Sequence, residues 1–471
     1  MEITANAFRE RATRALKDED LQGALKNLKR GFQEKRAEAV SRLPEFSDLQ
    51  DHAVAIKDHT LHRLDLYLER FEEKVEANGG RVHWCRTAEE ARKTALAICK
   101  QAGAKTAVKG KSMIAEEIAI NDFLAKNGVE PIETDLGEYI IQLRHEPPSH
   151  IIAPAIHLKR EQIADTFRKE HGNFAPDRSL EAPRELVDEA RQIMRRRFLS
   201  ADIGISGANL LIAETGSVVL LSNEGNIDLS RTLPRVHIVI ASIEKIVPTL
   251  QDAAVILRLL SRSATGQEAA TYTSFISGPR RPGEVDGPEA FHVILLDNGR
   301  SKLLGGEFET MLRCIRCGAC LNHCPVYGAT GGHAYGAVYT GPMGAVLTPL
   351  IEGLDRAAPL PNASTFCGRC EEVCPMRIPL VSLLRRLRER QWRARNVSAV
   401  AQFSLKIWAF FAKRPALYHA ASQAFLRLSK AGRRRGWIRA WPRAGGWGAR
   451  FPAPEGTTFQ AALRAQKKRR P

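Results

Sequence analysis

The chain begins with apolar residues at three- and four-residue spacing, a period that predicts helices with one buried face. The clearest of these stripes lies just before Gly79-Gly80 and consists of Leu61, Leu64, Leu68, Phe71 and Val75. Two consecutive glycines are a helix-ending signal, so the helix should stop there. Residues 1–70 are therefore expected to form a helical N-terminal segment.

Beyond that segment, short apolar runs alternate with amphipathic stretches. Strands are predicted at 106–108, 129–132, 151–156, 210–213, 217–222, 236–241, 272–276 and 291–296. Helices are predicted up to Ala97 behind a Thr87–Glu90 capping box, after a Ser112 cap, and at 159–171, 184–198 and up to about Leu260. The turn at 214–216 should join two strands into a hairpin. Such alternation over residues 71–300 predicts an α/β domain with a mostly parallel sheet.

The pattern changes again after residue 300. A glycine-rich stretch, expected to be a loop or a close-packed connection, contains Gly328, Gly331, Gly332, Gly336, Gly341 and Gly344. After Pro379 leucines fall on one helical face and arginines on the other. Residues 301–396 are therefore expected to be a small, mostly helical domain.

Residues 397–430 mix large apolar and basic side chains, with Pro415 breaking the pattern in two. The apolar positions are Phe403, Ile407, Trp408, Phe410, Phe411, Leu417 and Phe425. Packing on the same protein is the first interpretation of such a stripe, docking to a partner the second and membrane contact the third. The last 40 residues are expected to be extended or disordered.

Charge separates the end of the chain from the rest. The formal net charge is +17 over 471 residues, but residues 377–471 hold 23 lysines and arginines against only two acidic residues, Glu389 and Glu455. This basic tail could meet an acidic partner, an anionic membrane surface or nucleic acid, or could simply be solvated. With no long charge-free apolar stretch and no leader-type start, the predicted location is the cytoplasm, with peripheral contact at the inner face of the membrane as an extension.

Seven of the nine cysteines lie between residues 314 and 374, in two runs. The first run is Cys314-x2-Cys317-x2-Cys320-x3-Cys324-Pro325. The second is Cys367-x2-Cys370-x3-Cys374-Pro375. The first run has the spacing of bacterial ferredoxins, and the second has the same spacing with Ser364 in place of its first cysteine. Structural zinc uses two separated cysteine pairs, and disulfides do not suit this spacing, so both are disfavoured.

The sequence therefore predicts two [4Fe-4S] clusters in a helical ferredoxin-like domain. In two-cluster ferredoxins the last cysteine of each run reaches the other cluster. On that rule cluster one is held by Cys314, Cys317, Cys320 and Cys374, and cluster two by Cys324, Cys367 and Cys370. A serine, a water, a neighbouring side chain or a three-iron form would complete cluster two. The remaining cysteines, Cys85 and Cys99, are expected to be buried and unreactive.

With these runs behind an α/β domain, the chain resembles the lactate-utilisation iron–sulfur protein family, type B, over nearly its whole length. The resemblance is carried by both cysteine runs and by Val108-Lys109-Gly110-Lys111-Ser112, Glu133-Thr134-Asp135-Leu136-Gly137-Glu138, Ala213-Glu214-Thr215-Gly216, Ser222-Asn223-Glu224-Gly225-Asn226 and Gly331-Gly332-His333-Ala334-Tyr335-Gly336. It implies an α/β domain similar to the sugar-phosphate isomerase and CoA-transferase fold. It also implies that the missing cysteine is a family trait.

The same resemblance implies an electron carrier in a three-component system that oxidises L-lactate to pyruvate. The partners would be a cysteine-rich companion and a lone α/β companion. The chain shows neither a Gly-x-Gly-x-x-Gly unit behind a strand nor a P-loop, so no hydride-accepting site is predicted and the chain is expected to carry electrons rather than to catalyse. The alternative is the iron–sulfur subunit of another membrane-associated 2-hydroxy-acid or quinone-linked dehydrogenase. A nucleic-acid partner is disfavoured because basic and aromatic residues do not alternate over a folded surface.

The α/β domain also offers candidate ligands for an anion. Lys109, Lys111 and Ser112 stand at a predicted helix start, where free backbone N–H groups favour a carboxylate. Asn209, Thr215 and Asn226 are further candidates. The competing interpretation is structural, because Ser112 also suits a helix cap and the neighbouring glycines suit turns.

Overall fold

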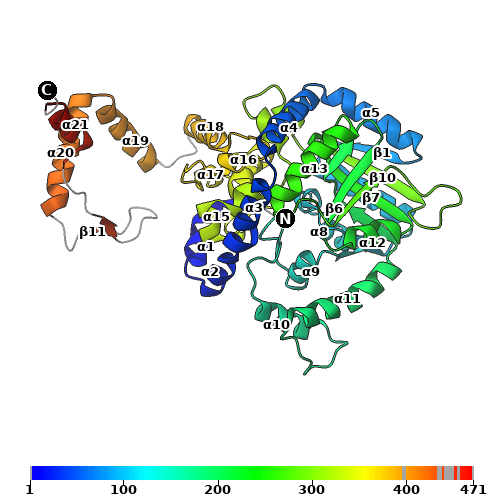
Figure 1. The fold of residues 1–471 in the computed structure, drawn as a ribbon. Coiled ribbons are helices and arrows are strands. Elements are labelled where there is room, and N and C mark those ends of the chain that lie inside the picture. The colour runs from blue at the N-terminus through cyan, green and yellow to red at the C-terminus, as the bar shows by residue number, and fades with distance from the viewer. Residues whose placement is uncertain (1–2, 395–398, 432–436, 440–449, 453–456, 469–471) are drawn as a thin grey trace. The chain divides into compact units, whose positions relative to one another are not determined.

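The computed structural model describes residues 3–394, 399–431, 437–439, 450–452 and 457–468. Residues 1–391 form one compact unit and residues 392–471 a second, and each is described by itself. The first unit contains two sheets and most of the helices (Figure 1).

A six-stranded sheet, parallel throughout, forms the frame of the first unit. In spatial order its strands are β1 (Arg81–Cys85), β10 (Ala290–Leu296), β7 (Val236–Ser242), β4 (Ile203–Ser206), β2 (Thr106–Lys109) and β3 (Glu130–Glu133). The chain runs from β2 outward to β3, then turns back through β4, β7 and β10. The winding direction of the sheet therefore reverses between β2 and β4.

A second sheet lies against one face of the first and contains the predicted hairpin. Its strands, in order, are β8 (Ile246–Val247), β5 (Leu210–Ile212), β6 (Ser217–Ser222) and β9 (Tyr272–Ile276). Strands β5 and β6 pair antiparallel, as the hairpin prediction requires. Strand β9 joins this sheet antiparallel to β6 rather than continuing the parallel one.

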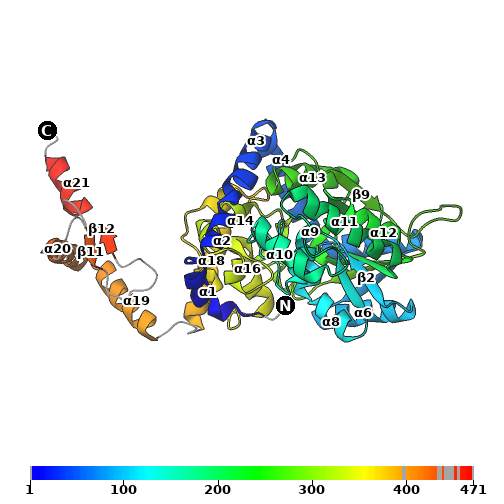
Figure 2. The same cartoon turned by 90° about the horizontal axis from the view of Figure 1, so that it is seen from below.

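Alternating side chains explain why the large sheet is buried on both faces. In β7, Ile238 and Ile240 face a core made with α6–α8, whereas Val239 and Ala241 face the second sheet and α5. Figure 2 shows α6 and α8 together on one side of β2. A strand buried on both faces has a continuous apolar run, which is the pattern typical of parallel sheets.

The helices of the α/β domain close these two faces and the β3 edge. They are α5 (Leu64–Ala77), α6 (Ala88–Gln101), α7 (Met113–Glu117), α8 (Ile120–Lys126), α9 (Leu136–Leu143), α10 (Arg160–Glu170), α11 (Pro183–Ser200), α12 (Asn226–Thr232) and α13 (Leu250–Ala264). The Thr87 and Ser112 hydroxyls accept hydrogen bonds from the backbone N–H groups of Glu90 and Ala115, so both predicted N-caps are confirmed. The capping box predicted at Thr87 is incomplete, because the Glu90 carboxylate accepts from the N–H of Arg86 rather than from that of Thr87.

The remainder of the first unit combines both ends of its sequence in one apolar core. N-terminal helices α1 (Phe8–Ala15), α2 (Glu19–Leu25), α3 (Lys35–Ser41) and α4 (Phe46–Leu61) share this core with C-terminal helices α14 (Ala319–Asn322), α15 (Pro325–Thr330), α16 (Gly341–Glu352), α17 (Arg369–Glu372) and α18 (Leu380–Arg393). Figure 1 shows α1 and α2 beside α15. The fold is thus an α/β domain followed by a helical domain, as predicted, but the N-terminal helices complete the helical domain.

The prediction of a strand at 151–156 is wrong: this stretch is a loop of bends and turns. Pro154 has no N–H to give to a sheet. The N–H groups of Ile152 and Ala153 donate to His150 Nδ1 instead, and the carbonyl of Ile152 accepts from Lys111 Nζ. The backbone N–H and C=O groups that would pair with a neighbouring strand are thus hydrogen-bonded to side chains.

The structure differs from the predictions in three further ways. The stripe that was expected to lie on one helix is divided, because α4 ends at Leu61 and α5 begins at Leu64. Strands β1, β4 and β8 and helices α9 and α12 were not predicted. The glycine-rich connection is close-packed, as one interpretation held, but it also contains helix α16, in which Gly344 lies so near Tyr339 that a Cβ atom would stand 2.1 Å from its carbonyl oxygen.

The second unit contains α19 (Ala399–Ala412), α20 (Pro415–Ala431), the antiparallel pair β11 (Trp437–Arg439) and β12 (Arg450–Pro452), and α21 (Phe459–Lys468). The break predicted at Pro415 is confirmed. Helix α21 contradicts the expectation that its residues are extended or disordered, whereas 432–436, 440–449, 453–456 and 469–471 lie outside the described residues. No helix among the described residues is long and apolar enough to cross a membrane.

Candidate metal centre and the adjacent pocket

The two cysteine runs have the same local backbone plan. In each run a residue with positive φ (Arg316 or Phe366) and a glycine with positive φ (Gly318 or Gly368) precede a one-turn helix, α14 or α17. Cys320 and Cys370 lie within these helices. Sharp turns of this kind let successive thiols converge on one side of the loop.

The thiols fall into two neighbourhoods in space, and none of them forms a disulfide. Burial, with the neighbouring Cys374 and Cys314 thiols, raises the pKa of Cys317 to about 12. Burial, with Cys324 and Cys367 as thiol neighbours, raises the pKa of Cys370 to about 12. The last cysteine of each run thus lies close to thiols of the other run. We define group one as Cys314, Cys317, Cys320 and Cys374, and group two as Cys324, Cys367 and Cys370.

The donor set fits iron–sulfur clusters. Thiolate is the ligand these clusters take, and a coordinating metal deprotonates its thiols. Without a metal, burial disfavours the charged form and raises the pKa of Cys320, Cys324 and Cys374. A bound metal would stabilise the thiolate form of these clustered, mostly buried thiols, so the arrangement favours metal coordination.

Group one is surrounded by cations and by donors. The Arg36 guanidinium lies near the Cys317 and Cys374 thiols and donates to the carbonyl of Val373. The N–H of Ile378 donates to Cys374 Sγ at 3.5 Å. Because Arg36 belongs to α3, a helix from the N-terminal segment contributes to the wall of this group.

Group two has different surroundings. Ser364, at the position of the missing cysteine, accepts a hydrogen bond from the N–H of Phe366 at 3.1 Å. Cys367 is exposed, unlike Cys324 and Cys370. The Tyr335 side chain is fully buried, and burial first, then the neighbouring Cys324 thiol, raises the pKa of its hydroxyl.

A buried ion-pair network joins the helical domain to the α/β domain. Arg300, fully buried after β10, pairs with Glu117 at 2.6 Å and with Glu244 at 3.0 Å. From the helical domain, Arg316 reaches Glu244 at 3.1 Å and the Tyr339 hydroxyl donates to Glu117 at 2.7 Å. The loop between Cys314 and Cys317 is therefore anchored on the ends of the parallel strands.

A cavity of about 430 Å³ lies beside this network. Its walls come from the segments after the carboxyl ends of β2, β3, β4 and β7, from the second sheet, and from the loop that carries Ile315 and Arg316. The polar side chains that matter most for its chemistry are those of Lys111, Asp135, Asn209, Glu224, Asn226, Lys245 and Arg316.

The structure brings four of the six anion-ligand candidates to this cavity and leaves two outside it. Lys111, Ser112, Asn209 and Asn226 line it. Lys109 does not, because its ammonium is buried between Glu133 at 2.7 Å and Glu116 at 3.1 Å. Thr215 lies on the hairpin turn, which packs on the end of α5. Its hydroxyl donates to that of Ser217.

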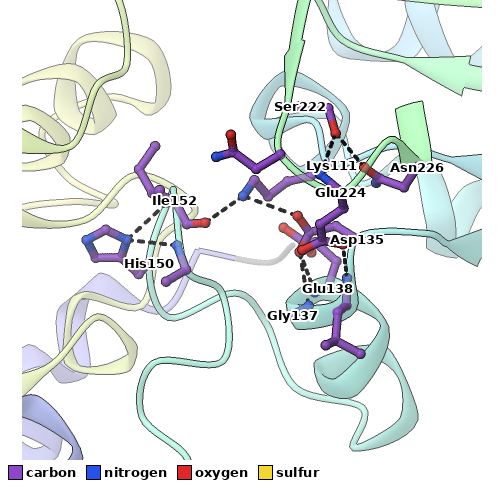
Figure 3. A network of polar contacts seen from close by, with 12 residues as sticks. Lys111, Asp135, Gly137, Glu138, His150, Ile152, Ser222, Glu224 and Asn226 are labelled. Carbon is purple, nitrogen blue, oxygen red and sulfur yellow. Dashed lines mark hydrogen bonds and ion pairs between the residues drawn. The ribbon is translucent and has the colours of Figure 1, made fainter. Parts of the chain in front are cut away.

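Most of the retained candidates are already engaged in structural contacts. Lys111 donates to Ile152 at 2.6 Å and pairs with Asp135 at 3.5 Å (Figure 3). Ser112 caps α7, a helix of only five residues, and the Asn226 side chain joins Ser222 to Thr134. Burial and the nearby Asp135 raise the pKa of Glu224, which accepts a hydrogen bond from the N–H of Leu136. The predicted anion site at the helix start is thus mostly structural.

Lys245 and Arg316 were not predicted as pocket residues. Lys245 follows β7 in a single-turn segment, and nothing in its sequence context marks it. Arg316 stands between two cluster cysteines, which was a usable signal, because a cation there must lie next to whatever the thiols hold. Cys85 and Cys99 are buried, as expected, and burial raises the pKa of both.

Comparison with known families divides the chain in the same way. Residues 68–296 match the LUD domain, and residues 310–378 match the 4Fe-4S dicluster domain. A solved structure of a DUF162 family protein from Deinococcus radiodurans covers 50% of this chain and 98% of its own at 15% identity, but its TM-score of 0.26 is too low to support any argument.

Full-length relatives are much closer. Lactate utilization protein B of Bacillus velezensis is 41% identical over 479 residues, covering 100% of this chain and 99% of its own. The proteins of the same name from Bacillus licheniformis and Bacillus subtilis are 42% and 41% identical, each over 469 residues and 98% of this chain, and over 97% and 96% of their own lengths.

Proposed function

This chain belongs to the lactate utilization protein B family, and on that premise we propose that it is the iron–sulfur electron-transfer subunit of a multi-component system oxidising L-lactate to pyruvate. The observation that carries the proposal is the arrangement of seven thiols, six of them buried or partly buried, in two adjacent groups that each draw on both cysteine runs. A single group could hold a metal without any electron transfer, whereas two neighbouring groups suit the passage of electrons from one to the other.

Group one would hold one [4Fe-4S] cluster with four cysteines, and group two would hold a second with three. Bound clusters would supply one-electron carriers whose potentials depend on charge, hydrogen bonds to sulfur and exposure. The chain's own residues provide those influences: Arg36 places a positive charge near group one, the backbone of Ile378 donates to Cys374, and the surrounding apolar core excludes water.

Oxidation of L-lactate to pyruvate releases two electrons and two protons. Two one-electron carriers match that pair of electrons in number. The C–H bond would be broken on a partner subunit, since this sequence contains no recognisable nucleotide or flavin motif. The proposed partners are a cysteine-rich companion and a lone α/β companion, with the complex in the cytoplasm.

The test is to purify the chain anaerobically and to follow its visible absorbance. The proposal expects about eight irons per chain, no bleaching with L-lactate alone, and bleaching when L-lactate and the companion subunits are both present. D-lactate is the matched control for the substrate. Bound zinc in place of iron, or the absence of bleaching with all components present, would refute the proposal.

A second candidate is the iron–sulfur subunit of another membrane-associated 2-hydroxy-acid or quinone-linked dehydrogenase. It is favoured by the exposed aromatic side chains of α19, where Phe403 and Trp408 keep 67% and 62% of their surface exposed beside basic residues. In that case 2-hydroxy acids other than lactate would bleach the absorbance at least as fast, and the chain would sediment with anionic vesicles.

A further inference from the structure

The pocket beside group one occupies the place where open parallel sheets bind ligands. In such sheets the ligand lies outside the carboxyl ends of the strands, at the point where the winding reverses. Here the reversal falls between β2 and β4. The segments that follow these two strands, with Lys111 and Ser112 on one side and Asn209 on the other, both line the pocket.

Those two segments approach each other closely. A Cβ atom on Gly207 would stand 2.7 Å from the Ser112 hydroxyl oxygen, so position 207 has no room for a side chain. Both residues of this contact line the pocket. It continues toward β7 and the helical domain, where Lys245 and Arg316 contribute to its wall.

Two hydrogen-bond donors in this pocket are free. The Lys245 ammonium forms no hydrogen bond or ion pair with any described residue, although it lines the cavity. The Asn209 side-chain oxygen accepts from the N–H of Leu221 at 2.9 Å, which leaves its amide N–H₂ group without a partner among the described residues. An unpaired ammonium is costly away from bulk water unless something anionic accompanies it.

The far wall of the pocket is the loop between the first two cysteines of group one. Ile315 and Arg316 from this loop line the cavity, and the Cys314 thiol lies in the electrostatic neighbourhood of Lys245. Arg316 is held by Glu244 and stacks over the Tyr339 ring at 4.9 Å. A molecule in the pocket would thus sit between the α/β domain and group one.

We propose that this pocket binds a short-chain 2-hydroxy or 2-oxo carboxylate, with the Lys245 ammonium and the Asn209 amide as donors to its oxygens. The anionic charge follows from the free donors, whereas the choice of a 2-hydroxy or 2-oxo acid rests on the proposed function. Asp135 and Glu224 supply carboxyl groups that can accept a hydrogen bond from a hydroxyl. The pocket would place substrate or product within this chain, next to group one.

The binding test uses the full-length protein with its clusters, purified anaerobically, and calorimetric titration with L-lactate and with pyruvate. Acetate and inorganic phosphate are the comparison anions. Lys245→Gln should weaken binding at least about tenfold, since it removes a hydrogen bond from a charged donor. Lys302→Gln, which changes an exposed lysine outside the pocket, should leave binding unchanged.

A second measurement does not depend on any variant. Pyruvate labelled with ¹³C should show hyperfine coupling to the reduced cluster of group one and none to that of group two. No binding of either acid by the wild-type protein, equal binding by Lys245→Gln, or tighter binding of phosphate than of pyruvate would each overturn the proposal. Because these are binding measurements, they stand apart from bleaching by L-lactate with the companion subunits, which tests the proposed function.

Discussion

Cys314 and Ser364 stand at equivalent positions of the two cysteine runs, three residues before Cys317 and Cys367. The backbone after them is alike, with Arg316 matched by Phe366 and Gly318 by Gly368. One run nevertheless has a thiol at its start, whereas the other has a hydroxyl that accepts a hydrogen bond from the backbone N–H of Phe366. The two runs therefore share a backbone shape but differ in the side chain at this position.

The surroundings of the two groups differ more than their backbones. Group one lies beside Arg36 and Arg316, and the latter is tied to the α/β domain through Glu244. Group two includes the exposed Cys367, the Tyr335 hydroxyl lies beside its Cys324 thiol, and the Arg388 guanidinium donates to the carbonyl of Ser364 at 3.3 Å. The comparison indicates that the same backbone plan can carry one group of buried or partly buried thiols and one group with an exposed thiol, each with an arginine nearby.

The largest expected effect comes from removing a thiol across the repeat. Cys374→Ala should abolish the cluster of group one although Cys374 belongs to the second run, because its neighbours are Cys314 and Cys317. Cys370→Ala is the matched variant and should abolish the cluster of group two. Iron content and EPR of the reduced proteins report which cluster is lost. The same signal disappearing in both variants would contradict the assignment.

Next in size is the loss of the buried carboxylate behind group one. Glu244→Gln leaves Arg300 and Arg316 short of a counter-charge, and breaking a buried pair costs about 3–5 kcal/mol. The denaturant midpoint at pH 7 should fall accordingly. Glu69→Gln, on the exposed face of α5, is the control and should change the midpoint little.

The same carboxylate makes the effect depend on pH. Burial alone would raise the pKa of Glu244, but the Arg300 and Arg316 guanidiniums hold it at about 2. Its stabilising contribution is therefore present above about pH 4.3, the ordinary glutamate value, and is lost as pH falls from there toward 2. Wild type and Glu244→Gln should converge in stability over that window, and a constant difference would contradict this origin.

A kinetic difference is expected on exposure to air. The cluster of group two, with three thiolates and the exposed Cys367, should convert to a three-iron form first, visible by EPR in the oxidised state. Ser364→Cys should slow that conversion by supplying the fourth thiol. Ser382→Cys adds a thiol at an exposed site and should not slow it. Equal oxidation rates for the two clusters would mean that group two has a strong fourth ligand.

The smallest expected effect is on potential. If the Tyr335 hydroxyl donates to Cys324 once that sulfur is a thiolate, Tyr335→Phe should shift the midpoint potential of group two to a more negative value, because hydrogen bonds to sulfur favour the reduced cluster. The hydroxyl of Tyr327, another buried tyrosine, donates to the carbonyl of Ser149 instead, so Tyr327→Phe is the control. Redox titration followed by EPR distinguishes the two variants.

Local signals sufficed for most of the architecture. Long apolar runs such as the one in β7 predicted strands, and the Thr87 and Ser112 hydroxyls predicted helix starts, because both depend on neighbours within a few residues. Strand β4 was missed because Gly204 interrupts its apolar run, and the close packing that explains this glycine, with a Cβ 1.8 Å from the carbonyl of Ser230, cannot be seen in the sequence. The 151–156 loop was mistaken for a strand because its bonds to His150 and Lys111 cannot be seen in its own apolar pattern.

By itself the sequence determined which thiols are available to bind metal and in what order they stand, because thiol chemistry and the spacing of each cysteine run are properties of short segments. It determined the α/β class for the same reason, through periodicity. Only the tertiary structure decided that α1–α4 complete the cluster domain, that Lys109 is a buried ion-pair partner, and that Lys245 faces a cavity beside Arg316. These outcomes depend on charges and surfaces far apart in the chain, whose burial and pairing exist only once the sheet and the helical domain have packed together.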